Sequence, residues 1–574
     1  MLKNKNKWFW IEIAAVSFII AAGAYIRMVG LTCLPPGLYP DEAMNTSDGL
    51  TTAEAGGWKL FYENNNGREG LYINILGYLL HWFGPSLWIV RFLPALIGTL
   101  TLPAVYWLGR RLSGRFGAIM ALGLTAFSYW HLNFSRIGFR ALLMVFLLAW
   151  AFAFMVEGFY RLMYQKKRTG IIFAIGGLLF GLSIHTYIAV RIAPAVVVVL
   201  WVAGLMFLNR YWKNIIKYGF ITVLFAAIAA APILYDFAIH PDHFTGRTSN
   251  VSVLKSEHLL QDLSKSVFLT LASFVFYGDQ NWRHNYPLLP LMLPIWGVTL
   301  FAGVIWGIWL FFKELAAKIA RPVPLWFRAR KKPKSLRKYW EITAWIFLIA
   351  WWGALLMPSI LTNEGLPHAL RSIGSLVPAS LLVGLMLGKW AKNVTLKTVF
   401  SILLVVTAII NIYAYFSLWG RNPEAYGAFE YRLSGMGIYL RDEIAQRPDF
   451  NYYLVTNQDS FRTDVNLPVM VEPIRFYTWQ SRDKLEYILP DEFQVSAIKR
   501  PAKVFFLQDN DSISEKIYAA FPNTSQARVR LGSNQSSKTD AVSRGSVLFA
   551  PAGQECFLNT TVPVNYFFNY VEIR

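Results

Sequence analysis

The sequence predicts a polytopic α-helical membrane protein that carries a soluble C-terminal domain of the α/β or α+β class. Composition is the first observation, because 55% of the 574 residues are hydrophobic and only 16% are charged, against about 25% in soluble proteins. The second observation is a series of apolar runs close to the roughly 20 residues that a membrane-spanning helix needs. The third is a change near residue 420, after which strand-like segments replace the apolar runs.

Eleven apolar runs qualify as spans, and the first follows Lys3, Lys5 and Lys7 with no small-residue cleavage site after it. We therefore expect an uncleaved first helix in place of a removed signal peptide. The expected spans lie near residues 8–29, 86–108, 116–135, 139–160, 170–188, 190–208, 214–236, 288–312, 340–360, 371–388 and 396–418.

Basic residues collect in alternate short loops between these runs, and this alternation predicts the topology. The stretch from Lys313 to Lys338, for example, holds ten of them, whereas residues 421–574 hold 17 Lys/Arg against 18 Asp/Glu. The excess of positive charge therefore lies in the first 420 residues. The positive-inside rule places the N-terminus in the cytoplasm and the C-terminal domain outside the cell membrane. Since the charge forms no single patch, we expect no nucleic-acid partner.

The C-terminal segment shows strand patterns at 452–456, 503–507 and 546–549. A capping-box pattern, Ser512 to Glu515, predicts a helix that ends at Phe521. No catalytic signature occurs there. We divide the chain into a transmembrane domain, residues 1–420, and a soluble extracytoplasmic domain, residues 421–574.

Two exterior loops are long, and each contains a short amphipathic or apolar segment. Leu71 to Phe83 is apolar but too short to span, so we expect a helix in the membrane interface. Residues 237–287 contain a second such helix, with apolar positions three and four residues apart at Leu260, Leu263, Val267, Leu271 and Phe274.

Asp41 and Glu42 follow Tyr39-Pro40 in the first exterior loop, and they are the predicted catalytic pair. A solvated turn or a helix cap would account for the same local sequence. Ionisable and polar side chains at spans are costly and usually functional, although each alone could be an interfacial anchor. Those expected on the same side, and assigned to substrate binding, are Arg68, Glu69, Arg136, Arg140, His185, Tyr187, Arg191, Arg247, Arg283, His284, His368 and Arg371.

This combination suits transfer of a group from an anionic donor. A carboxylate can act as general base on a hydroxyl or an amine, and guanidinium groups can hold a phosphate and stabilise the charge that it gains. The chain contains neither a Walker A loop nor a His-Glu-x-x-His motif, so nucleotide hydrolysis and zinc-protease chemistry are not expected. No metal-ligand spacing is evident, and a divalent metal stays open as a cofactor.

The chain resembles the GT-C superfold glycosyltransferases that use polyprenyl-phosphate sugars, in the group of protein O-mannosyltransferases and lipid A aminoarabinose transferase. The likeness covers roughly residues 8–420. It rests on Tyr39-Pro40-Asp41-Glu42, Gly67-Arg68-Glu69-Gly70-Leu71-Tyr72, His185-Thr186-Tyr187 with Arg191, and Pro367-His368-Ala369-Leu370-Arg371 before Val377-Pro378.

The resemblance implies that Asp41 is the base and that Arg68 and Arg371 bind the donor phosphate. Many relatives carry a second acid in the loop after the third span, and residues 136–140 contain none. Glu42 or Glu69 would then take its place, or donor and acceptor handling would differ.

We therefore expect an inverting glycosyltransferase, of the hexosyl or pentosyl type, that moves a sugar from a polyprenyl-phosphate donor to an extracytoplasmic protein, lipid or glycan. The alternative is a transporter or flippase of lipid-linked sugars, but the spans show no two-halved repeat. The topology places Cys33 and Cys556 on the same side of the membrane. A disulfide bond between them is therefore one alternative.

Overall fold

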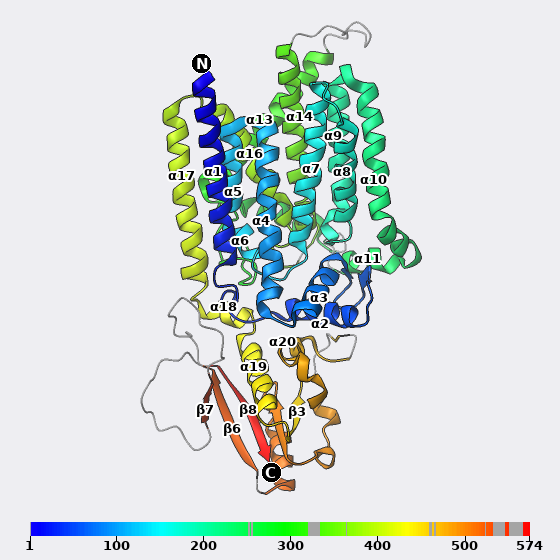
Figure 1. Cartoon of the computed structure of the whole chain (residues 1–574), viewed down its shortest axis with the longest axis vertical. Helices are drawn as coiled ribbons and strands as arrows, with labels where there is room; N and C mark the ends of the chain where they lie inside the picture. The colour runs from blue at the N-terminus through cyan, green and yellow to red at the C-terminus, as the bar shows by residue number, and fades with distance from the viewer. Residues whose placement is uncertain are drawn as a thin grey trace.

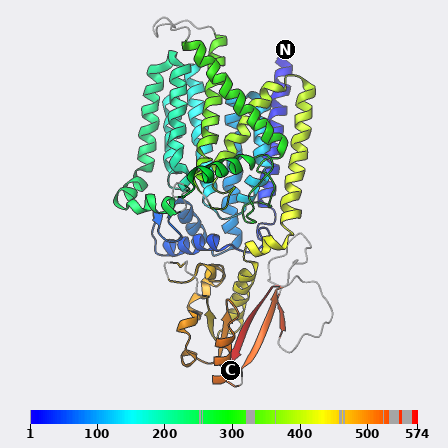
Figure 2. The same ribbon diagram turned by 180° about the vertical axis from the view of Figure 1, so that it is seen from behind.

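The computed structural model describes residues 2–250, 253, 256–319, 333–362, 364–457, 462–463, 466–522, 524–531, 546–549 and 566–574. A bundle of long helices forms one part, and a sheet with its helices forms the other (Figure 1). The N-terminus lies at the end of the bundle that is remote from the sheet, and the view from behind shows the same two parts (Figure 2).

Nine helical segments in the described residues are long and apolar enough to cross a membrane, so the chain is a multi-pass membrane protein. They are α1 (Leu2–Met28), α4 (Leu87–Leu112), α7 (Ala141–Met163), η1 (Ile188–Ile192) with α9 (Ala193–Phe207), η2 (Asn209–Tyr211) with α10 (Trp212–Ile239), α13 (Pro294–Ile319), α14 (Pro333–Ala354) with α15 (Met357–Ile360), η5 (Ile373–Ser375) with α16 (Leu376–Trp390), and α17 (Val394–Tyr413) with the π-helical η6 (Ala414–Trp419).

Two shorter apolar helices, α5 (Gly114–Ala126) and α8 (Thr169–Ser183), account for the remaining two expected spans. Helix α5 packs on α4 and α16, and α8 packs on α7 and α10. The third expected span is shorter than its apolar run because the helix stops at Phe127, and Ser128 then caps the separate helix α6 (Tyr129–Phe134) by accepting from the backbone N–H of His131. The expected fold class is confirmed.

The first long loop, between α1 and α4, folds at the end of the bundle that faces the sheet (Figure 1). It contains α2 (Pro40–Glu54), the antiparallel strands β1 (Phe61–Tyr62) and β2 (Arg68–Glu69), and α3 (Leu71–Phe83). Helix α3 has the expected bounds. It ends before Gly84, whose φ of 86° suits a residue without a Cβ.

The second loop contains α11 (Pro241–Asn250) and α12 (Leu259–Ala272), and α12 is the other helix expected from the sequence. Its inward face is polar, because Ser266 donates to the carbonyl of Ile360 at 2.8 Å. Leu260 and Phe268 are exposed instead. The expected apolar face is therefore divided: Leu260 faces away from the protein, whereas Leu271 packs against the core and Phe274, just beyond the helix, is fully buried.

The C-terminal part is a six-stranded mixed sheet in the order β4-β3-β5-β8-β6-β7. Strands β3, β4 and β5 are parallel, and β8 runs antiparallel to β5 and β6. Its elements are α18 (Pro423–Ala428), α19 (Tyr431–Gln446), β3 (Asn451–Val455), η7 (Val469–Val471), α20 (Glu472–Tyr477), η8 (Trp479–Lys484), β4 (Leu485–Ile488), η9 (Pro490–Glu492), η10 (Val495–Ala497), β5 (Ala502–Phe506), α21 (Asp511–Ala520), β6 (Ser525–Leu531), β7 (Ser546–Phe549) and β8 (Tyr566–Ile573).

Alternate residues of β3 enter two different cores, because side chains of a strand point to opposite faces of the sheet. Leu454 packs with α19 and α20, and Val455 packs with α21. The three expected strands are confirmed as β3, β5 and β7. The expected helix is α21, but the cap is Asn510 in place of Ser512: its side chain accepts from the N–H of Ile513 at 3.1 Å. Asparagine caps a helix as well as serine does, and Asn510, two residues before Ser512, starts the helix earlier.

The sheet domain packs directly on the first loop through α20 and α2. Glu54 of α2 accepts from the indole N–H of Trp479 at 2.9 Å and pairs with Arg482 at 3.1 Å. Cys33 of the first loop is disulfide-bonded, and Cys556, the one other cysteine of the sequence, lies outside the described residues.

Helices α2 and α3 cross at two glycines, and this crossing positions α2. A Cβ on Gly49 would lie 2.5 Å from the carbonyl oxygen of Ile73, and a Cβ on Gly77 would overlap the backbone of Gly49. We expect Gly77→Ala to separate the helices and to lower the free energy of unfolding by about 1–3 kcal/mol, the usual cost of overpacking.

The midpoint of thermal unfolding of the purified protein in detergent measures this effect. Gly353→Ala is the matched control, since a Cβ there meets no atom within 4 Å. Equal midpoints for the Gly77 variant and the wild type would mean that the crossing is not close-packed.

Candidate active site

Two buried arginines hold the loop that leads from α1 to α2. Arg91 of α4 donates to the carbonyls of Leu31 at 3.0 Å and Pro35 at 2.6 Å, and it also contacts the carbonyl of Gly37. Arg136 donates to four carbonyls at 2.9–3.0 Å, those of Ile26, Arg27, Gly30 and Leu34. Both side chains are fully buried. Arg136 therefore holds the end of α1 and the loop after it. Its expected contact with substrate stays a prediction.

The two acids of the predicted catalytic pair lie in different surroundings. Glu42 is fully buried and accepts from the backbone N–H groups of Gly138 at 2.7 Å and Tyr39 at 3.2 Å. Burial raises the pKa of its carboxyl group, and the nearby Arg91 opposes that rise. Asp41 is half-buried in the first turn of α2 and accepts from the side-chain amide of Asn65 at 3.0 Å. Asp41 is thus the member of the pair that a ligand can reach.

The turn between β1 and β2 brings Asn65 to Asp41. Asn65, Asn66 and Gly67 all adopt left-handed φ values, between 51° and 84°. Asparagine and glycine tolerate this conformation better than other residues do. Arg68 closes the turn, since it pairs with Asp48, contacts the side chain of Asn64 and donates to Asn45 at 2.7 Å. Arg68 was expected to bind phosphate, and here its charge is balanced by Asp48.

Glu69 is shared by two arginines from different parts of the chain. Its carboxylate lies 3.1 Å from Arg191 and 3.5 Å from Arg140, and it is only 2% exposed. Arg140 lies over the ring of Tyr187 at 5.6 Å, and Arg191 lies over Phe244 at 4.5 Å. One carboxylate therefore faces two guanidinium groups from different parts of the chain.

His185 joins the same region through its backbone and its ring. Its carbonyl accepts from the N–H of Leu71 at 3.3 Å, at the start of α3, and its Nε2 lies 2.9 Å from the carbonyl of Ala229 on α10. These contacts connect the first loop to two spans. Its expected contact with substrate is a prediction that these contacts leave open.

Tyr39, immediately before the acid pair, meets residues from a third loop. Arg283 lies over its ring at 4.5 Å and contacts its hydroxyl group, and Phe139 packs edge-on at 6.2 Å. The neighbouring His284 lies beside His368 with ring centroids 4.8 Å apart. The pKa of Tyr39 is raised, mainly by burial and then by the charge of Asp41.

Arg371 pairs with Glu364 at 2.9 Å, and Glu364 is 68% exposed. An ion pair with so exposed a partner contributes little and is readily exchanged for another anion. Arg247 belongs to α11, but its side chain lies outside the described residues.

The structure thus gathers most of the expected side chains at the end of the bundle next to the sheet domain. Two contributors were missed from the sequence: Asn65 and Arg91. An arginine inside an apolar run is a signal that could have identified Arg91. Asn65 carries no such signal, because many loop residues look the same.

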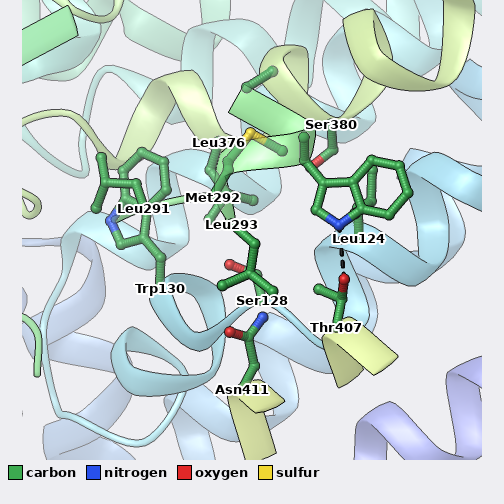
Figure 3. Close-up of a pocket in the computed structure, with 12 residues that line it drawn as sticks. Leu124, Ser128, Trp130, Leu291, Met292, Leu293, Leu376, Ser380, Thr407 and Asn411 are labelled. Carbon is green, nitrogen blue, oxygen red and sulfur yellow. Dashed lines mark hydrogen bonds between the residues drawn. The ribbon is translucent and has the colours of Figure 1, made fainter. Parts of the chain in front are cut away.

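The bundle also contains a small pocket, of about 20 Å³, that is separate from these residues (Figure 3). Ser128, Ser380 and Asn411 face it, and Trp296 donates to Thr407 at 2.7 Å on its wall. This volume suits about one water molecule. It is far too small for a sugar.

No protein-family model and no curated protein matches the sequence. Solved structures do match. ArnT from Cupriavidus metallidurans, bound to undecaprenyl phosphate, is 14% identical with a TM-score of 0.51, over 91% of this chain and 95% of that chain. The oligosaccharyltransferase AglB from Archaeoglobus fulgidus is 12% identical with a TM-score of 0.49, over 85% and 65%. The arabinofuranosyltransferase AftD from Mycobacteria is 14% identical with a TM-score of 0.40, over 80% and 31%.

At such low identity a structural likeness establishes the fold alone. The match to ArnT spans nearly the whole of both chains, from the helix bundle through the C-terminal sheet domain. The chain has the fold of the GT-C superfold glycosyltransferases, as the resemblance in its sequence predicts.

Proposed function

We propose that the protein is a membrane glycosyltransferase that moves a sugar from a polyprenyl-phosphate donor to an acceptor outside the cytoplasm. The observation that carries the proposal is the half-buried Asp41 at the start of α2, two residues after Tyr39, whose ring is covered by Arg283 from another loop. The ArnT structure holds undecaprenyl phosphate in the same fold, and this supports a lipid phosphate as the donor class here.

In the proposed reaction Asp41 removes a proton from a hydroxyl or amine of the acceptor. The acceptor then attacks the anomeric carbon from the face opposite the phosphate, and the bond between that carbon and the phosphate oxygen breaks. The electron pair of this bond leaves with polyprenyl phosphate. Because the attack comes from the opposite face, the configuration at the anomeric carbon is inverted. The phosphate changes from a diester to a monoester and gains negative charge, which guanidinium groups stabilise.

The ion pairs indicate which arginines have charge to offer the phosphate. Arg68 is balanced by Asp48 inside the protein. Arg140 and Arg191 share the single carboxylate of Glu69, and the partner of Arg371 is exposed. We therefore favour Arg371 as the phosphate ligand, because its partner Glu364 is exposed.

Glu42 supports Asp41 without acting as a second base. Its two carboxylate oxygens accept from the backbone of Tyr39 and of Gly138, which belongs to the loop that lacks the second acid of many relatives. Glu42 thus anchors that loop to the start of α2. Because both oxygens are engaged and buried, proton transfer to an acceptor is assigned to Asp41 alone.

We predict that Asp41→Asn lowers the rate of sugar transfer by about 10²–10⁴-fold, the usual contribution of a general base. Asparagine keeps an oxygen that accepts from Asn65, so the loop stays folded. Turnover is measured with purified protein and polyprenyl-phosphate sugars. Asp242→Asn, which changes an exposed acid of α11, should leave turnover unchanged. Transfer by the Asp41 variant at the wild-type rate would refute the assignment.

We predict that Arg371→Lys lowers kcat/KM by roughly ten- to a hundredfold, because lysine cannot reproduce the planar fork that grips a phosphate. An arginine that only anchors α16 in the interface would tolerate lysine. Glu364→Gln is the control: it removes the ion-pair partner of Arg371 and should not reduce kcat/KM. A lysine variant as active as the wild type would return Arg371 to an anchoring role.

The proposal also requires a sidedness, with the N-terminus in the cytoplasm and the sheet domain outside. After reduction, an impermeant thiol reagent added to intact cells should label Cys33. A cysteine introduced by Lys167→Cys, in the exposed loop between α7 and α8, should react only after permeabilisation, in a background without the native cysteines. The opposite labelling pattern would reverse the topology and place the acid pair in the cytoplasm.

A further inference from the structure

We infer that Asp279, His284 and His368 form a binding site for a divalent transition metal, with Zn²⁺ as the best match. Asp279 and His284 belong to the loop between α12 and α13, and His368 belongs to the loop between α15 and α16. Their ligand atoms all lie within 4.8 Å of one another. The inference rests on this geometry and not on the proposed transferase activity.

The three side chains already face one another. Oδ2 of Asp279 lies 3.2 Å from Nδ1 of His284, and the two imidazole rings are tilted by 30° with centroids 4.8 Å apart. Zinc bonds of 2.0–2.1 Å in a tetrahedron place ligand atoms about 3.3 Å apart. Side-chain rotations that bring the most distant ligand atoms about 1.5 Å closer would therefore complete the site.

Hydrogen bonds from neighbouring groups hold these three residues in place, as they do for the ligands of established metal sites. Oδ2 of Asp279 accepts from the N–H of Ala369 at 2.7 Å, and its Oδ1 accepts from the N–H of Asn281 at 2.8 Å. The carbonyl of His368 accepts from the hydroxyl group of Ser372 at 2.7 Å. Both loops are thereby held beside the cluster by their own backbones.

The chemistry of the ligand set selects the metal. Two imidazoles and one carboxylate suit Zn²⁺ and its neighbours in the first transition series, whereas Mg²⁺ and Ca²⁺ prefer oxygen ligands alone. Three protein ligands also leave one tetrahedral position for water or another oxygen donor. Asp279 is 3% exposed and His284 is 7% exposed, so the metal would be well shielded.

The position of the cluster gives the metal a structural consequence. His284 follows Arg283, which covers the ring of Tyr39 beside the acid pair. The ring of His284 itself packs near Phe139. A bound metal would tie the loop that carries Arg283 to the loop that carries His368 and Arg371. The distance between the cations of these two loops would then be fixed by the metal.

The test uses the full-length protein in detergent, stripped with a chelator, loaded with Zn²⁺ and passed through gel filtration. Elemental analysis should find one zinc per chain, and zinc should raise the midpoint of thermal unfolding. We expect Asp279→Asn, His284→Gln and His368→Gln each to lose both effects. His258→Gln is the control, because His258 is exposed at the start of α12 and should leave one zinc bound.

Wild-type protein that retains no more zinc than the His284→Gln/His368→Gln double variant would overturn the inference, and the three groups would then form a hydrogen-bonded cluster only. Asp279 also accepts from the backbone of Ala369, so its variant could fail to fold, and in that event the two histidine variants decide. One zinc per chain in a protein that transfers no sugar would refute the proposed function while leaving the metal site intact.

Discussion

The arrangement of the site depends on the satisfaction of backbone carbonyls by buried arginines. The last turn of α1 and the loop that follows expose carbonyls without helical partners, and buried carbonyls need donors. Arg136 reaches the carbonyls of Ile26, Arg27, Gly30 and Leu34, and Arg91 reaches those of Leu31 and Pro35. The cation of Arg136 also suits the negative end of the α1 dipole. Because Arg91 and Arg136 belong to other elements, Asp41 is positioned by the bundle as a whole.

The buried charges around the acid pair form two arrangements. One is an ion pair of a single arginine with a single carboxylate, and the other is a carboxylate shared by two arginines. Arg68 with Asp48 is a closed pair that braces the β1–β2 turn. Breaking such a buried pair is costly, since it leaves one uncompensated charge. Glu69 instead faces both Arg140 and Arg191. Two guanidinium groups from different elements thus meet at one carboxylate, and guanidinium groups are the side chains best suited to hold a phosphate.

The fold could be predicted further than the site. Apolar runs of spanning length and alternate basic loops led to all eleven helices, because the bilayer imposes its thickness on the sequence. Asp41 was recognised as one half of an adjacent pair, but the sequence could not divide the roles. That division depends on burial, which leaves Asp41 accessible and encloses Glu42. Asp279 was not recognised as a candidate metal ligand, because His368 is distant from it in the sequence and the two side chains come close only through loop packing.

The C-terminal domain packs on α2 through α20, and this contact argues that the domain is part of the site's framework. Glu472 of α20 is fully buried and pairs with Arg475 of the same helix at 3.0 Å. Burial raises the pKa of Glu472, and the charge of Asp48 adds to the rise. Asp48 in turn holds Arg68, which closes the turn that brings Asn65 to Asp41. A displacement of the sheet domain would thus reach Asp41 through the packing of α20 on α2 and the buried pair of Arg68 with Asp48, without any contact between that domain and the substrate.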